Sequence, residues 1–160
     1  MNNRNRYQKL LLGITVFFLA VVLVTGCVQP EPSVATGVIS EVTTSKGLDD
    51  NDRPVNPTNV FPADIQDICL SFKISGFPVG TEIEVQWIYL GGDPETEALT
   101  GKDYVAETQT ATVTEASAGY TATVYSRPGI AGYEAWPKGD YKIVINAGGQ
   151  EKATTSFKIQ

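Results

Sequence analysis

The chain has 160 residues, and its 12 basic and 18 acidic side chains give a formal net charge of −6. This surplus of acid argues against a nucleic-acid partner, because affinity for nucleic acid comes from basic side chains that neutralise phosphates. The sequence contains no histidine, which excludes Ser-His-Asp and Cys-His nucleophilic sites and histidine-ligated zinc.

The first element is a positively charged start followed by an apolar run. Arg4, Arg6 and Lys9 precede residues 10–26, a stretch without charged side chains that is rich in Leu, Val and Phe. This order is typical of a secretory signal helix whose positive end stays inside the cell. The run is also close to the shortest length that spans a bilayer. An uncleaved membrane anchor and a soluble secreted product are therefore alternatives.

The apolar run ends in Leu-Val-Thr-Gly-Cys at residues 23–27. This stretch resembles the lipobox of bacterial and archaeal lipoproteins. The resemblance implies that a peptidase cuts between Gly26 and Cys27 and that the sulfur of Cys27 carries lipid. Membrane lipid is then a partner of the chain through Cys27. The implied location is extracytoplasmic, in the cell envelope, on the outer face of the cytoplasmic membrane or on an outer membrane.

A mature chain that begins at Cys27 has 134 residues and lacks the three basic residues of the leader. Its nine basic and 18 acidic side chains give a net charge of −9, which disfavours a domain lying flat on anionic lipid. Two prolines make residues 27–33 an extended tether that holds the domain within roughly 20 Å of the membrane. We therefore divide the chain into a signal peptide at 1–26, a lipidated cysteine and tether at 27–33, and one domain at 34–160.

The domain shows short stretches of alternating apolar and polar residues, separated by clusters of Gly, Pro, Asn and Asp. This pattern predicts an all-β fold. The first strand is expected at residues 37–44, with Val38 and Val42 on the same face. A polar connection at residues 46–67 follows.

Six further strands are expected beyond this connection. They are placed at residues 68–74, 83–89, 104–114, 120–126, 141–146 and 154–159. An acidic loop is expected at residues 91–103, and Gly148 and Gly149 turn the chain between the last two strands, which form a hairpin. Seven strands at this spacing predict two packed antiparallel sheets.

The order of these strands resembles an immunoglobulin or fibronectin type III sandwich. Trp87 stands where the family's third strand carries a buried tryptophan, and residues 139–143 are similar to its tyrosine corner, with Tyr141 as the corner residue. The family's inter-sheet disulfide is missing, because Ile143 occupies the position of the second cysteine. The core is expected to include Phe72, Trp87, Tyr141 and Phe157. A likeness of architecture implies no activity.

Residues 49–54, Asp-Asp-Asn-Asp-Arg-Pro, concentrate oxygen donors of the kind that calcium prefers. The candidate ligands are Asp49, Asp50, Asn51 and Asp52. The stretch faintly resembles the Asp-x-Asn-Asp-Asn-x-Pro linker of cadherins, with Arg53 in place of an Asn. Asp and Asn are also the residues that form turns, so a solvated turn without metal is the favoured interpretation. Calcium is the one cofactor that the sequence suggests.

Four aromatic residues follow in the later part of the chain: Tyr120, Tyr125, Tyr133 and Trp136. Because Tyr and Trp dominate binding hot spots, Tyr133 and Trp136 are candidates for contact with a sugar ring or a protein. Alternatively, Trp136 fills the open end of the sandwich beside Tyr141, since burying a tryptophan stabilises a small core by on the order of a few kcal/mol. Tyr133 is the better candidate for exposure.

Two further groups have side chains that can carry chemistry, the thiol of Cys69 and a pair of glutamates. Cys69 lies in the middle of a strand without a histidine or helix end to lower its pKa, so it is expected to be inert packing. Glu82 and Glu84 share one face of a strand, as a solvent-exposed face requires, and are not expected to act as a catalytic pair. The sequence therefore predicts a lipid-anchored envelope protein whose sandwich binds or scaffolds an extracytoplasmic protein or polysaccharide. The alternative is a carbohydrate-binding surface module, with or without calcium.

Overall fold

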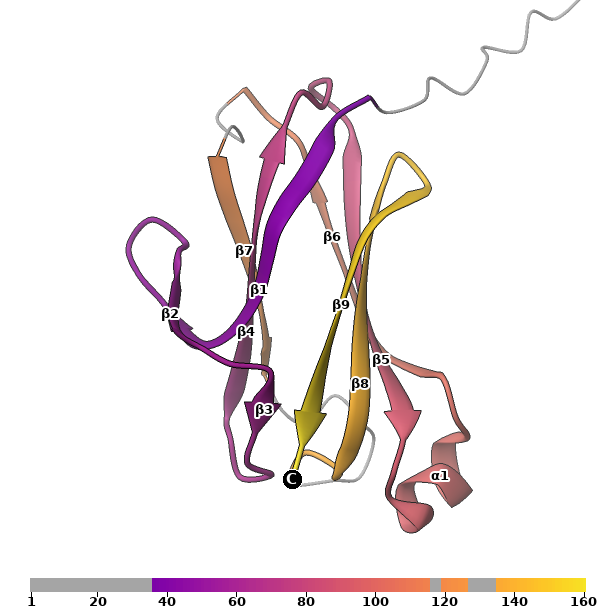
Figure 1. The fold of residues 1–160 in the computed structure, drawn as a ribbon. Coiled ribbons are helices and arrows are strands. Elements are labelled where there is room, and N and C mark those ends of the chain that lie inside the picture. Colours follow the sequence, from indigo (N-terminus) through magenta and orange to yellow (C-terminus); the bar gives the residue numbers. More distant parts are fainter. Residues whose placement is uncertain (1–35, 116–118, 127–134) are drawn as a thin grey trace, which may run out of the picture. The chain divides into compact units, whose positions relative to one another are not determined.

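The computed structural model describes residues 36–115 and 135–160 and, between them, the backbone of residues 119–126. These ranges contain nine strands in two facing sheets and one short helix, α1 (Pro94–Thr100) (Figure 1). The strands are β1 Val38–Leu48, β2 Pro54–Pro57, β3 Val60–Phe61, β4 Asp67–Ser75, β5 Glu82–Gly91, β6 Tyr104–Thr112, β7 Gly119–Ser126, β8 Gly139–Ala147 and β9 Gln150–Ile159. One sheet has the order β2-β1-β4-β7 and the other β3-β9-β8-β5-β6.

The predicted all-β, immunoglobulin-like sandwich is confirmed. Each of the seven expected strands is present, and these seven pair in antiparallel fashion within their sheets. Buried apolar side chains from both sheets form one core between them. The alternation of apolar and polar residues therefore identified the strands that carry the core. In the larger sheet, β8 is the central strand and lies between β9 and β5.

The connection at residues 46–67 is more regular than expected, because it contains β2 and β3. The strand β2 pairs only with β1 and lies at a sheet edge, where proline is tolerated because no backbone N–H is needed on the open side. The strand β3 pairs with β9 in parallel, so the second sheet is mixed rather than purely antiparallel. The side chain of Phe61 is fully buried, which anchors this short strand to the core.

The predicted face of the first strand was wrong. Val38 is 57% exposed, whereas its neighbour Ile39 is buried. The pairing of β1 with β4 shifts between Ser40 and Thr43, and Glu41 has a φ of 54°. A bulge adds one residue and reverses the alternation that follows it. Val42 therefore packs against the core, while Val38 points away from it.

The expected acidic loop contains the helix α1. Asp93 caps it, since its carboxylate accepts hydrogen bonds from the backbone N–H of Thr96, at 3.1 Å, and from the Thr96 hydroxyl. The hydroxyl contact is the main reason that the pKa of the Asp93 carboxyl lies below its ordinary value. Pro94 begins the helix, and Gly101 ends it with an N–H bond to the carbonyl of Glu97. Asp-Pro followed by glutamates is a sequence that favours the start of a helix. A helix of seven residues is, however, too short to show a helical period in the sequence.

Aromatic side chains of the larger sheet form the centre of the core. The rings of Tyr141 and Phe157 stack with centroids 4.8 Å apart, and Trp87 meets Phe157 edge-on at 6.0 Å. The Tyr141 hydroxyl donates a buried hydrogen bond of 2.8 Å to the carbonyl of Pro137, which is the contact that defines a tyrosine corner. Phe72, on β4 of the facing sheet, is 2% exposed. All four residues expected in the core are thus buried.

We expect Tyr141→Phe to destabilise the fold by about 1–2 kcal/mol, because the buried carbonyl of Pro137 loses its donor while the ring packing is kept. Chemical denaturation of the two proteins measures the difference in free energy of unfolding. Tyr104→Phe is the matched control, since Tyr104 is only partly buried. Equal stability changes in the two variants would contradict the role of the corner hydrogen bond.

Candidate functional site

Three residues expected to function lie outside the described part of the chain: Gly26, Cys27 and Tyr133. Lipid attachment, cleavage and the exposure of Tyr133 therefore stay predictions. In the described ranges no helix is both long enough and apolar enough to cross a membrane. The remaining candidates fall on the loop between β1 and β2, on Trp136, on Cys69 and on the glutamates of β5.

The loop at residues 49–53 closes the hairpin between β1 and β2. The Oδ1 atom of Asp49 accepts hydrogen bonds from the backbone N–H groups of Asn51, at 2.8 Å, and of Arg53, at 2.9 Å. These bonds hold the pKa of the Asp49 carboxyl below its ordinary value, and the bond from Arg53 contributes more than the bond from Asn51. The carbonyl of Asp52 in turn accepts a 2.6 Å bond from the hydroxyl of Ser71 on β4. The loop is therefore a turn closed by its own amides and attached to the first sheet.

The same geometry bears on the calcium hypothesis. A calcium site brings several carboxylate and carbonyl oxygens together around one point. Across the described residues, no three or more Asp, Glu, Cys or His side chains converge in a way that could hold a metal ion. Asp49 directs its oxygen at backbone amides, and Asp50, Asn51 and Asp52 are exposed. The loop has the geometry of an exposed turn, and calcium binding stays a prediction to be tested.

We expect Asp49→Ala to lower the melting temperature at neutral pH, because two backbone N–H groups lose their acceptor. The folded-state pKa of Asp49 is depressed, so its contribution is present above the ordinary carboxyl pKa of about 3.9 and is lost as the pH falls through the lowered value. The difference between wild type and variant should therefore shrink in strong acid. Asp50→Ala, at an exposed position of the same loop, is the control in thermal melts across this range.

The same melts test for metal. Millimolar calcium should leave the melting temperature of the wild-type chain unchanged, since a ligand that binds only the folded state raises it. A rise that Asp49→Ala abolishes would show that the loop binds calcium and would overturn the turn interpretation.

Trp136 lies in the core and not on the surface. Its side chain is 4% exposed, and its ring meets Tyr141 edge-on at 5.7 Å and Phe157 at 6.2 Å. Its backbone N–H donates to the carbonyl of Ala63 at 3.1 Å. A sugar-stacking platform needs an open ring face, which this packing does not provide. Trp136 therefore fills one end of the sandwich, as the alternative interpretation held.

The surroundings of Cys69 and of Glu84 on β5 are those of residues that stabilise the fold. Cys69 is buried, and burial raises the pKa of its thiol, with a smaller contribution from the charge of Asp67. Raising a thiol pKa disfavours the reactive thiolate. On the outer face of β5, Glu84 accepts side-chain hydrogen bonds from Gln86 at 3.0 Å and Asn146 at 2.9 Å. These groups stabilise a solvent-exposed face.

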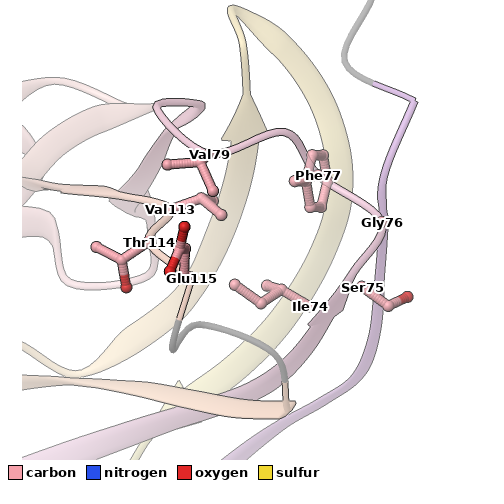
Figure 2. A pocket seen from close by; sticks show the side chains of 8 residues that line it. All are labelled: Ile74, Ser75, Gly76, Phe77, Val79, Val113, Thr114 and Glu115. Carbon is pink, nitrogen blue, oxygen red and sulfur yellow. The ribbon is translucent and has the colours of Figure 1, made fainter.

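An apolar cavity lies at the end of the sandwich where β1 begins. It has a volume of about 170 Å³ and is lined by Ile74, Ser75, Gly76, Phe77, Val79, Val113, Thr114 and Glu115. Figure 2 shows Phe77 on one side of the hollow and Val79 and Val113 on the other, with Ile74 between them. Sequence reasoning missed this cavity. The available signal was the turn Gly-Phe-Pro-Val at residues 76–79, which carries two large apolar side chains where turns usually carry polar ones.

A second, more open depression of about 510 Å³ lies beside the start of β8 and the end of β9. Its lining residues are Asn59, Val60, Leu90, Asp140, Tyr141, Ser156, Phe157 and Lys158. Lys158 and Asp140 form an exposed ion pair of 3.7 Å at its edge, and such pairs contribute little stability. The depression brings together no group suited to catalysis.

No protein-family model matches the chain, and no curated protein matches it. Among solved structures, an alkylpurine DNA glycosylase from Pseudomonas fluorescens bound to abasic-site DNA has a TM-score of 0.50 at 13% identity, over 79% of this chain and 31% of that one. An immunoglobulin-like protein from Pseudomonas aeruginosa has a TM-score of 0.47 at 14% identity, over 79% and 94%. A β-glucosidase from Listeria innocua, in complex with laminaribiose, has a TM-score of 0.43 at 8% identity, over 79% and 16%.

These similarities concern architecture. The chain spans 31% of the glycosylase and 16% of the glucosidase, and at such identities a likeness shows the fold alone. The protein is an immunoglobulin-like β-sandwich, a fold that hosts many unrelated functions. Its function has to be argued from its own residues.

Proposed function

We propose that the protein is a lipid-anchored component of the cell envelope whose sandwich binds or scaffolds a partner and catalyses no reaction. The observation that carries the proposal is the order of segments in the sequence. A lipobox ending at Cys27 is followed by a short proline-containing tether and then by one sandwich domain. An acyl group on Cys27 would hold the domain outside the cytoplasm, on the outer face of the cytoplasmic membrane or on an outer membrane.

The position of the first strand supports a direction for this attachment. The start of β1 and the turn between β4 and β5 lie at one end of the sandwich, whereas α1 and the C-terminus lie at the other (Figure 1). An anchor that precedes β1 attaches the domain to lipid at the first end, and the second end is the one farther along the strands from the point of attachment. The second end presents Leu99 of α1, which is 75% exposed. We assign contact with an extracytoplasmic protein to this outward end.

The chemistry of the chain supports a role in binding. The sequence has no histidine, the thiol of Cys69 is buried with a raised pKa, and Glu84 is engaged in side-chain hydrogen bonds on an outer face. A catalytic carboxyl needs an apolar or charged environment that shifts its pKa toward the working pH. Neither Glu82 nor Glu84 lines the apolar cavity, and Glu115, which does, is exposed to solvent.

Cys27→Ser should abolish incorporation of labelled fatty acid and leave an unprocessed precursor, because the sulfur that accepts the lipid is gone. Cys69→Ser is the control and should be labelled and processed like the wild type. Thiol titration after unfolding gives an independent measure, since acylation of Cys27 leaves Cys69 as the one titratable thiol. Normal processing of Cys27→Ser would show that residues 23–27 are not a lipobox.

A carbohydrate-binding module is the competing function. Trp136 is buried, so this function would depend on Tyr133 and not on Trp136. In the turn at residues 49–53, the Asp49 carboxylate is engaged by backbone amides, so calcium would have to compete with these bonds. We expect the purified protein to bind no wall or capsule polysaccharide on a glycan array. Binding that is lost in Tyr133→Ala and kept in Trp136→Phe would favour this second function instead.

A further inference from the structure

We propose that the end of the sandwich next to the tether contacts the lipid surface directly, through the exposed valines and the apolar cavity found there. We call this surface the tip and define it as Val38, Ile74, Phe77, Val79 and Val113. The inference rests on the proposed lipid anchor at Cys27. It adds that the domain contacts the membrane end-on, with side chains of the tip in the headgroup region. The anchor alone would hold the domain near the membrane without such contact.

The chain enters the domain at the rim of the cavity. Val38, the first residue of β1, pairs with Ser75 of β4, which lines the cavity. The preceding residue, Gly37, lies directly against the ring of Phe77, since a Cβ atom at Gly37 would come within 2.2 Å of the Phe77 Cγ atom. The point of attachment and the apolar surface are thus the same place.

Two valines of the tip are exposed beside the cavity. Val38 is 57% exposed and Val79 is 66% exposed, and they flank a hollow of about 170 Å³ lined largely by apolar groups. A cavity of roughly 150 Å³ is enough to admit a benzene-sized apolar molecule. Apolar surface of this kind, beside a membrane attachment point, is the chemistry that inserts into the boundary between headgroups and acyl chains.

The short tether places lipid within reach of the tip. Thr36, the first described residue, is nine positions after Cys27, so a fully extended chain spans at most about 32 Å. The nine residues of β4 carry the sandwich about 30 Å further from its near end to its far end. The tip, where the tether enters the domain, can therefore reach the surface to which Cys27 is attached, and the end with α1 lies about one sandwich length from the tip.

The charge of the domain decides the kind of contact. Glu82 and Glu115 are exposed at this end, and Glu115 borders the cavity. The mature chain carries a net charge of −9. Anionic headgroups would repel such a surface, so the contact is apolar and insensitive to salt, in contrast to a basic patch that is released as ionic strength rises.

The test uses the processed, lipidated protein in phosphatidylcholine vesicles that contain a nitroxide-labelled lipid as quencher. An environment-sensitive fluorophore is attached to Val79→Cys or Leu99→Cys, two similarly exposed positions at opposite ends of the domain. A third label at Val55→Cys, 41% exposed on the side of the sandwich, separates end-on contact from lying flat. Wild-type protein measures background labelling, which is low because Cys69 is buried.

We expect blue-shifted emission and several-fold stronger nitroxide quenching at position 79 than at positions 55 and 99, unchanged in high salt. Equal quenching at the three positions, or none at position 79, overturns the inference. A blue shift at position 79 without quenching would place a second protein copy on the tip and also overturns it. Circular dichroism confirms that each labelled variant is folded.

Flotation of the vesicles distinguishes this failure from failure of the proposed function. A wild-type chain that floats with the vesicles, but whose label at position 79 stays in water, is anchored without tip contact. A chain that neither floats nor carries fatty acid has no lipid anchor, and both proposals fail together. Val79→Ser and Leu99→Ser complete the comparison, since only the first should reduce quenching of a label placed at Val38→Cys.

Discussion

The packing around Tyr141 is the interaction on which the far end of this sandwich depends. Its hydroxyl holds the carbonyl of Pro137, and its ring stacks on Phe157 while Trp136 meets it edge-on. The short segment before β8 therefore closes over the aromatic core instead of opening to solvent. Neighbouring Tyr89 reaches the same corner, where its hydroxyl accepts the backbone N–H of Asp93 at 2.8 Å. One aromatic cluster thus fixes both the sheet and the cap of α1, without the disulfide that such sandwiches often contain.

The strands that carry this core were predictable, because their alternation follows directly from burial of one face. Trp87 and Tyr141 were identified by their positions in that pattern, and both are fully buried. The bulge at Glu41 was not predictable, since one extra residue leaves no mark in composition and reverses the face of Val38. The strand β3 could not be predicted either, because two residues show no alternation. Its pairing with β9 joins residues that are far apart in the chain, Val60 with Lys158 and Phe61 with Ile159.

The candidate sites show where sequence reasoning reaches its limit. An aspartate that binds calcium and one that closes a turn have the same local sequence, and only the hydrogen bonds to Asn51 and Arg53 separate them. Trp136 has the composition of a binding platform, yet its neighbours bury it. The cavity beside Phe77 could not be predicted, because it is formed by the turn after β4 and the end of β6, which are nearly 40 residues apart in the chain. Local residue types indicate chemistry, but packing decides availability.

The contact between Gly37 and the ring of Phe77 also has a mechanical meaning. Tension from an anchor enters the domain at this point and passes into β1, which is hydrogen-bonded to β4 from Val38 to Ser45. If the opposing load is applied at the end with α1, the force runs along the strands. The hydrogen bonds between β1 and β4 are then loaded in shear, all at the same time, instead of opening one after another from one end. A domain pulled at these two ends therefore keeps β1 paired with β4 until several hydrogen bonds break together.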